Sequence, residues 1–207
     1  VHIDYTLEEP DILGTAGALD NARHLLCDAP FLIVNGKIIS DIDIAAAVET
    51  HKRSDALATM VLKPNVKREK FTIVETEDGR VTGFGEMARP LTEEEIRDTE
   101  HDIVTPLMFT GIHILEPRVL DLIEPGVYSD IVPHVYRPAL ERGEKIAAHV
   151  TEGNWYELST IPRYLDISLA MMNGDDVFKG ENCKIASSAS VRDSVMWDNV
   201  TVGEDVT

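Results

Sequence analysis

The chain has 207 residues, of which 43% are apolar and 27% are charged, the composition of an ordinary globular protein. Its 37 acidic and 19 basic side chains give a net charge of −18, which repels nucleic-acid phosphates and anionic lipid. No apolar run approaches the roughly 20 residues that a membrane span needs. We therefore expect a soluble, cytoplasmic protein that binds neither nucleic acid nor membranes, and whose anionic ligands are small and locally held.

The cysteines and histidines give no sign of a structural metal site or a disulfide framework. Cys27 and Cys183 are far apart and outside CxxC spacing, so we expect free thiols. The seven histidines form no HxH or HExxH pair, the spacing that sets two ligands on one face. The chain opens at Val1 without an initiator methionine or a signal sequence, which suggests a fragment.

Apolar runs alternate with helical patterns from the start of the chain. A helix is predicted at about 17–26, followed by a strand at 31–34 whose four consecutive apolar residues are typical of a strand covered on both faces. A helix at about 44–53, with Asp43 as its N-cap, leads to a strand at 56–62. This strand–helix–strand order predicts a parallel sheet.

A hairpin and a helix start are predicted next. The segments 71–75 and 80–84 flank Asp78-Gly79, a pair that supplies the left-handed residues of a tight hairpin turn. Thr92 and Glu95 have the spacing of a capping box, which predicts the start of a helix. The remaining expected elements are a strand at 107–115, a short helix at 117–122, a helix capped by Ser129 that ends near Gly143, a strand at 145–150 and a helix at 162–172 that ends at Gly174.

The pattern changes after Gly180, where helical periodicity stops. Apolar residues recur at steps of six, five and six, and a second apolar set lies four residues behind each of them. This near-hexad repeat is typical of a parallel β-helix, in which each rung buries its face against the next. The residues are Ile185, Val191, Met196 and Val202, followed by Ala189, Val195, Val200 and Val206.

Three loops are candidates for chemistry, because sites in open parallel sheets lie beyond the carboxyl ends of the strands. In "LGTAGAL", residues 13–19, the small side chains let a backbone approach a ring or ribose, and amides at a helix start favour anionic oxygens. A tight helix entry explains this loop equally well. "VNGK" ends in Lys37, and Glu157 ends a short strand before Thr160, a helix cap. Taken separately, Lys37 is predicted to be a surface charge and Glu157 to face solvent; taken together, the last two loops are expected to present one cation and one carboxylate to the same crevice.

Five segments in register carry a resemblance that covers nearly the whole chain: "LGTAGAL", "PFLIVNGKIISDIDI", "MFTGIHILEP", "SDIVPHVYRPALERGEKIAAHV" and "WYELSTIPRYL". They resemble the sugar-1-phosphate nucleotidyltransferases, in the mannose-1-phosphate guanylyltransferase and glucose-1-phosphate nucleotidyltransferase branch that continues into a left-handed β-helix. The resemblance implies an α/β, Rossmann-like nucleotidyltransferase domain with a mainly parallel mixed sheet at 1–176. The first rungs of a left-handed parallel β-helix would follow at 181–207.

The resemblance also implies ligands and roles. The family couples a nucleoside triphosphate to a sugar 1-phosphate with Mg²⁺, releasing pyrophosphate, and its members associate as homo- or hetero-oligomers. Carried over by motif, the nucleotide-binding residues are Gly14, Thr15, Ala16, Gly17, Asn35 and Gly36. The residues that bind the sugar phosphate are Glu86, Arg89, Thr110 and Gly111. The catalytic positions are Lys37 and Glu157, with Glu157 as a weak Mg²⁺ ligand.

The chain departs from the family pattern at the positions that matter most for Mg²⁺. Lys37 replaces the aspartate of NGD, and Glu157 replaces the aspartate that opens DIGTP. An ammonium group cannot ligate Mg²⁺, although it can place a positive charge against phosphates. Met87 stands where the family has a lysine for the sugar's phosphate, with Arg89 two residues on. The family's opening strand and GGxGTRL loop do not occur in these residues.

Two explanations therefore stay open. The chain is either a truncated copy of an active enzyme with unusual substitutions, or part of a degenerate relative that serves as a regulatory or assembly subunit. Asp41 and Asp43 are nearby carboxylates for the lost metal role, although Asp43 is better explained as a helix cap. An acyltransferase built on the β-helix is a third idea, but it needs a histidine, and the repeat region contains none.

Overall fold

In the computed structural model, the chain forms two compact units. The first unit comprises Val1–Asn35 and Asp41–Asn154, and the second comprises Gly36–Ser40 and Trp155–Thr207. The division predicted between residues 176 and 181 rests on the end of helical periodicity and on the family resemblance, and it stays a prediction. The residues that the structure describes are 1–93, 95, 104–172 and 177–207.

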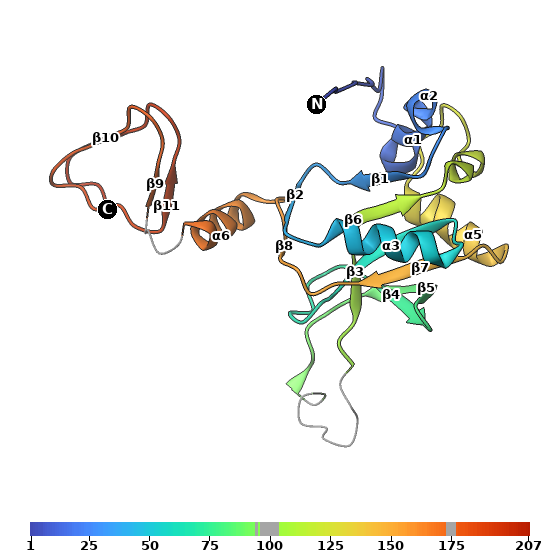
Figure 1. The fold of residues 1–207 in the computed structure, drawn as a ribbon. Coiled ribbons are helices and arrows are strands. Elements are labelled where there is room, and N and C mark those ends of the chain that lie inside the picture. Colours follow the sequence, from blue (N-terminus) through green and yellow to red (C-terminus); the bar gives the residue numbers. More distant parts are fainter. Residues whose placement is uncertain (94, 96–103, 173–176) are drawn as a thin grey trace. The chain divides into compact units, whose positions relative to one another are not determined.

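A six-stranded sheet forms the centre of the first unit, in the order β1-β6-β3-β7-β5-β4 (Figure 1). β6 pairs antiparallel with β1, β3 and β4, and β5 pairs antiparallel with β4 and β7. β3 and β7 form the one parallel pair among the described strands of this sheet. The strands are β1 (Phe31–Val34), β3 (Ala58–Pro64), β4 (Thr72–Glu77), β5 (Arg80–Met87), β6 (Leu107–Leu115) and β7 (Ile146–Val150).

The expectation of a mainly parallel sheet is therefore wrong, although the fold is mixed α/β. β1 and β3 run in the same direction, as the strand–helix–strand pattern predicted, but β6 lies between them and is antiparallel to both. β1 is also not covered on both faces, because Leu32 and Val34 are 40% and 48% exposed. The short apolar run alone did not distinguish an edge strand from a central one.

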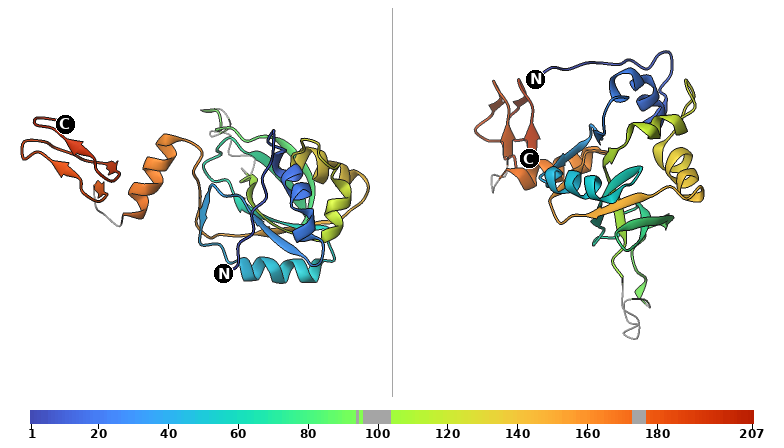
Figure 2. Two further views of the ribbon diagram at one scale, coloured as in Figure 1. Left: turned by 90° about the horizontal axis from the view of Figure 1, so that it is seen from above. Right: turned by 45° about the vertical axis from the view of Figure 1, so that its right-hand side comes forward.

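Helices cover both faces of this sheet. α3 lies on one face, whereas α1, η2 and α5 lie on the other, as the two directions of view agree (Figures 1 and 2). The apolar faces of α1, η2 and α5 pack with η1 and the sheet around one core, which includes Leu57, Met60, Leu115, Val119 and Tyr136. The helical segments are α1 (Gly14–Asn21), α2 (Arg23–Leu26), α3 (Ile44–Ser54), η1 (Pro117–Leu122), η2 (Ile131–Tyr136) and α5 (Arg137–Glu141).

Most of the local start and turn signals are confirmed. The Asp43 side chain accepts a hydrogen bond from the Ala46 amide and caps α3, as predicted. Asp78 and Gly79 have φ angles of 48° and 73°, the left-handed pair of the predicted hairpin turn. In contrast, the N-cap of η2 is Asp130 and not Ser129.

The Thr92–Glu95 capping box is confirmed by its reciprocal hydrogen bonds. The Glu95 amide donates to the Thr92 hydroxyl at 3.3 Å, and the Thr92 amide donates to the Glu95 carboxylate at 2.7 Å. The body of the helix predicted after it lies outside the described residues, as does the predicted helix end at Gly174.

The second unit begins with an antiparallel pair, β2 (Ile38–Ser40) and β8 (Trp155–Glu157), and continues into α6 (Ile161–Met171). β9 and β11 then pair in parallel, as do β10 and β12. These two short pairs are present, but no β-helix is identified in the described residues. The strands are β9 (Val177–Lys179), β10 (Lys184–Ile185), β11 (Ser194–Met196) and β12 (Thr201–Val202).

The predicted inward positions of the repeat region differ in burial. Met196 is 6% exposed and lies inside the segment, whereas Ile185 and Val206 are 37% and 46% exposed.

Among the helices that the structure describes, none is long and apolar enough to cross a membrane.

Candidate functional site

Lys37 and Glu157 lie side by side in the second unit. β2 pairs with β8 so that Ile38 is opposite Glu157, and the Leu158 amide donates to the Lys37 carbonyl oxygen at 2.8 Å. The Lys37 Nζ is 2.6 Å from Glu157 Oε1. The prediction that these two turns are neighbours is confirmed, and the two side chains form a direct ion pair.

Glu157 has a second cationic partner that the sequence did not reveal. Its Oε2 accepts a hydrogen bond from Arg163 Nη1 at 3.2 Å and one from the Ser159 hydroxyl at 3.1 Å. Arg163 is in the first turn of α6, which starts where the Thr160 hydroxyl accepts from the Arg163 amide. The signal that could have identified Arg163 is its position three residues after a helix cap, on the turn that faces back toward the strand end.

The electrostatics of this site keep Glu157 ionised. Partial burial raises the pKa of its carboxyl, but the hydrogen bonds from Lys37 and Ser159 and the charges of Lys37 and Arg163 more than offset it, so the pKa lies below its usual range. Lys37 is 52% exposed, and an ion pair of this kind contributes under about 1 kcal/mol to stability. The main effect of the ion pair is therefore not on stability: the Lys37 ammonium group lies where a cation would have to approach Glu157.

We predict that the site loses this contribution in acid. Because the pKa of Glu157 is lower in the folded chain than in the unfolded one, the stabilisation is present above the ordinary glutamate pKa of 4.5. It is lost as the pH falls through the lower, folded value. Urea unfolding of the wild type and of Glu157→Gln between pH 7 and pH 3 should show the two stabilities converging toward acid. A difference that stays constant over this range would contradict the assignment.

The residues present at this site do not fit Mg²⁺. Mg²⁺ requires oxygen ligands in near-octahedral geometry, and an ammonium group already lies against the one carboxylate available. Asp41, a candidate replacement, is bonded through both oxygens to the Asn154 amide and side chain at 2.6 Å each. Asp43 caps α3. Within the described ranges, no group of three or more His, Cys, Asp or Glu residues could hold a metal ion.

The "LGTAGAL" loop opens α1 in the first unit, and its helix-start amides are already bonded. The Ala16 and Gly17 amides donate to the Ser129 carbonyl oxygen at 2.7 and 3.0 Å. The Thr15 amide and hydroxyl both donate to Asp130 Oδ1 at 3.2 Å. The small residues therefore allow the segment around Ser129 to approach closely, which is the packing explanation of the loop. This contact with Asp130 was not predicted.

Four of the residues expected around the ligand lie at or near strand ends, and they differ in burial and in their contacts. At the carboxyl end of β1, the Asn35 amide donates to the Gly111 carbonyl oxygen at 3.1 Å, so these two predicted residues are neighbours. Thr110 is 1% exposed, and its hydroxyl donates to the Val61 carbonyl oxygen at 2.7 Å, which gives it a structural role. Gly36, in the second unit, is exposed with open space beside it.

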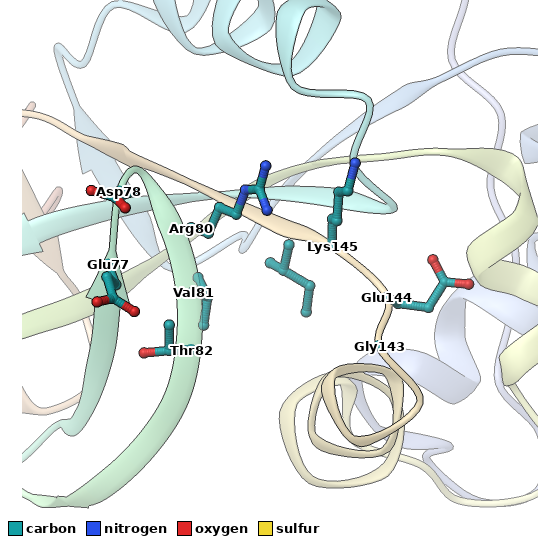
Figure 3. Close-up of a pocket in the computed structure, with 9 residues that line it drawn as sticks. Glu77, Asp78, Arg80, Val81, Thr82, Gly143, Glu144 and Lys145 are labelled. Atoms are coloured by element: carbon teal, nitrogen blue, oxygen red, sulfur yellow. The ribbon is translucent and has the colours of Figure 1, made fainter.

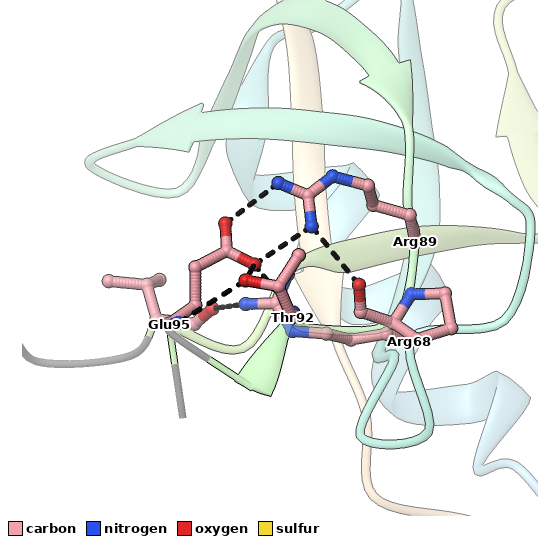
Figure 4. Close-up of polar contacts among 6 residues, drawn as sticks. Arg68, Arg89, Thr92 and Glu95 are labelled. Atoms are coloured by element: carbon pink, nitrogen blue, oxygen red, sulfur yellow. Dashed lines mark hydrogen bonds and ion pairs between the residues drawn. The ribbon is translucent and has the colours of Figure 1, made fainter. Parts of the chain in front are cut away.

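Arg89, the expected substitute for the family's lysine, is engaged by Glu95 (Figure 4). Its two terminal nitrogens lie 2.9 and 2.7 Å from the two oxygens of Glu95, a bidentate ion pair. The hydrogen bonds from Arg89 and Thr92 lower the pKa of Glu95 to about 2. Glu86, on the same strand end, is exposed and adds a negative charge near Arg89. Any sugar phosphate at Arg89 must therefore compete with Glu95.

Comparison with known sequences shows the family to which the chain belongs. The family model described as nucleotidyl transferase matches residues 1–174. The chain belongs to the nucleotidyl transferase family. It is 31% identical over 163 residues to a mannose-1-phosphate guanyltransferase of Yarrowia lipolytica, covering 76% of this chain and 40% of that protein. It is 26% identical over 204 residues to a UTP–glucose-1-phosphate uridylyltransferase of Synechocystis, covering 92% of this chain and 48% of that protein.

A solved structure supports the fold. HddC from Yersinia pseudotuberculosis, crystallised with GMP-PN, matches 76% of this chain and 62% of that chain with a TM-score of 0.56 and 16% identity. The chain spans about half the length of the curated relatives that it matches. The sequence matches show that the chain belongs to the sugar-1-phosphate nucleotidyltransferases as a group. Its homology to the mannose-1-phosphate guanylyltransferases and to UDP-glucose pyrophosphorylase is distant.

Proposed function

We propose that this chain belongs to a protein that binds a nucleoside triphosphate and a sugar 1-phosphate, with GTP and mannose 1-phosphate as the preferred pair. The reaction class is nucleotidyl transfer. A phosphate oxygen of the sugar 1-phosphate attacks the α-phosphorus, the bond from that phosphorus to the β-phosphate oxygen breaks, and NDP-sugar and pyrophosphate form. The observation that carries the proposal is the family match over residues 1–174, supported by the guanyltransferase relative.

The described residues can contribute in this proposal mainly by binding and charge neutralisation. Asn35 and Gly111 offer adjacent backbone at the end of β1, where ligands of open α/β sheets bind. Lys37 and Arg163 supply two positive charges on either side of Glu157. In a chain of net charge −18, such local cations are what an anionic phosphate needs. In this proposal Glu157 has no role as a metal ligand, because the Lys37 ammonium group already lies against its carboxylate.

A second candidate is a catalytically impaired regulatory or assembly subunit of the same family. It is favoured by the Lys37–Glu157 ion pair, because a cation of the protein itself holds the carboxylate that an active relative would offer to a metal. Such a subunit would bind the nucleotide or the NDP-sugar without turnover, and would associate with an active copy or with itself.

We also propose that residues 177–207 begin a left-handed parallel β-helix. Paired residues are 17 apart in both parallel pairs, Lys184 with Thr201 and Val177 with Ser194, which is a constant coil length. Beyond the strands, the Ser190 amide donates to the Val206 carbonyl oxygen at 2.8 Å, so a third side also stacks.

The test uses the full polypeptide in which the chain occurs. Calorimetric titration should show binding of GTP or GDP-mannose, and pyrophosphate release with GTP and mannose 1-phosphate distinguishes the two candidates. Turnover well above a no-enzyme blank removes the regulatory candidate, whereas binding without turnover removes the enzymatic one. If none of the common nucleoside triphosphates or NDP-sugars binds, both candidates are wrong.

A further inference from the structure

An open pocket of about 450 Å³ lies in the first unit, between the β4–β5 turn and the connection from α5 to β7 (Figure 3). Its volume is within the range of small-molecule sites. None of the residues that line it is among the candidate site residues described above. They are Glu77, Asp78, Arg80, Val81, Thr82, Gly143, Glu144, Lys145 and Ile146.

Two cationic residues, Arg80 and Lys145, line this pocket from neighbouring strands. Arg80 is opposite Ala147 in the β5–β7 ladder, and Lys145 lies two positions before Ala147. The Lys145 carbonyl oxygen accepts from the Leu57 amide at 2.8 Å, so the sheet extends to Lys145 and its side chain is on the same face as that of Ala147. Arg80 and Lys145 are therefore diagonal neighbours, at about 7–8 Å between their strand positions. Figure 3 shows both side chains on the same side of the pocket.

Among the described residues, the acidic side chains that line the pocket form no ion pair with these cations. Glu144 forms its ion pair with Arg118 at 2.6 Å. Glu77 is opposite Arg80 in the β4–β5 ladder, but the two side chains are directed to different sides in Figure 3. Over the residues that the structure describes, no ion pair or side-chain hydrogen bond engages Arg80 or Lys145. Two like charges this close raise the energy of the site unless an anion lies between them.

We propose that this pocket binds the phosphate group of a small phosphorylated metabolite, with Arg80 and Lys145 as its cationic ligands. The planar guanidinium of Arg80 can bind two phosphate oxygens, and Lys145 supplies a compact second charge. The carboxylate of Asp78, which also lines the pocket, is an acceptor for sugar hydroxyls on the same molecule. The site is separate from the proposed nucleotidyl transfer and does not depend on it.

The probes are inorganic phosphate and glucose 6-phosphate, the latter chosen because it has no phosphate at C1 and is not a substrate of the proposed reaction. Each is titrated calorimetrically into the full chain at constant ionic strength with KCl. Arg80→Ala and Lys145→Ala should each weaken binding at least about tenfold, because each removes charged hydrogen bonds to phosphate. Arg80→Lys, which keeps the charge without the fork, should weaken it less. Lys67→Ala, an exposed lysine outside the pocket, is the matched control and should bind as the wild type does.

The outcomes separate the possible ligands. If glucose 6-phosphate binds more tightly than inorganic phosphate, the pocket also binds the sugar. If the two bind equally, the pocket recognises the phosphate group alone. Both results require the losses in Arg80→Ala and Lys145→Ala. If these variants bind as tightly as Lys67→Ala, or if neither probe binds the wild type, the proposal is overturned. GTP binding should be the same in all of these variants, so that a failure here leaves the proposed function intact.

Discussion

Replacing Lys37 by aspartate should give the second unit a Mg²⁺ site that the natural chain does not have. The backbone holds positions 37 and 157 together through the Leu158–Lys37 hydrogen bond and the β2–β8 pairing, neither of which depends on the Lys37 side chain. The new carboxylate would therefore face Glu157, and two carboxylates with water are an ordinary Mg²⁺ ligand set. In the absence of metal, the added negative charge should raise the pKa of Glu157, because like charges disfavour ionisation.

The measurement is the melting temperature as Mg²⁺ is added at fixed ionic strength. A metal that binds only the folded state stabilises it by about 2.7 kcal/mol at a hundred times its dissociation constant. Lys37→Asp should show this rise, and Lys37→Met should not, since methionine removes the charge without adding an oxygen ligand. In the full protein, pyrophosphate release by Lys37→Asp should also increase with Mg²⁺. Equal responses of Lys37→Asp and Lys37→Met to Mg²⁺ would show that position 37 is not the reason for the misfit.

The sequence could predict the Lys37–Glu157 neighbourhood but not the complete site. Glu157 ends β8 and Lys37 lies in the turn before β2, and both were predicted to lie in strand-end loops that face one crevice. For the contact of Glu157 with Arg163, the local signal is limited to the position of Arg163 three residues after the Thr160 cap, which does not give the direction in which α6 leaves β8. The same limit applies to Arg89, whose partner Glu95 was predicted only as half of a capping box.

Local capping was predictable, whereas strand order was not. Asp43 and Thr160 act within three residues of themselves, so a short segment contains all the information for their hydrogen bonds. The insertion of β6 between β1 and β3 joins segments about 80 residues apart, and nothing in the four apolar residues of β1 indicates which strand lies beside them.

The helix predicted after Ser129 shows an intermediate case. Ile131, Val135 and Ala139 recur at helical spacing in this segment, and all three are buried. Its form was not predicted, because η2 has the wider π-helical turn before α5 begins. Pro138 lacks an amide hydrogen and its ring collides with the carbonyl four residues earlier in a regular α-helix, so a wider turn ahead of it relieves the conflict.

Gly14→Ala should destabilise the first unit by roughly 2–4 kcal/mol, whether or not a nucleotide binds beside it. Gly14 has a φ of +80°, a conformation that costs an alanine about 1–2 kcal/mol. An added Cβ would also lie 2.7 Å from the Ser129 carbonyl oxygen, a backbone atom that accepts two amide hydrogen bonds from the start of α1. If the oxygen moved away, its hydrogen bonds from the Ala16 and Gly17 amides would weaken. The cost of these hydrogen bonds therefore adds to the conformational cost of the alanine.

Two matched glycines separate these effects, with the free energy of unfolding in urea as the measurement. Gly126 has a φ of +69° and open space for a Cβ, so Gly126→Ala should show the conformational cost alone. Gly36 has open space and no left-handed φ, so Gly36→Ala should change stability by well under about 1 kcal/mol. The loss of unfolding free energy should be larger for Gly14→Ala than for Gly126→Ala, because only the Cβ added at Gly14 would contact backbone atoms. If Gly14→Ala is as stable as Gly36→Ala but loses GTP binding, the small residues of this loop serve the ligand and the packing explanation is wrong.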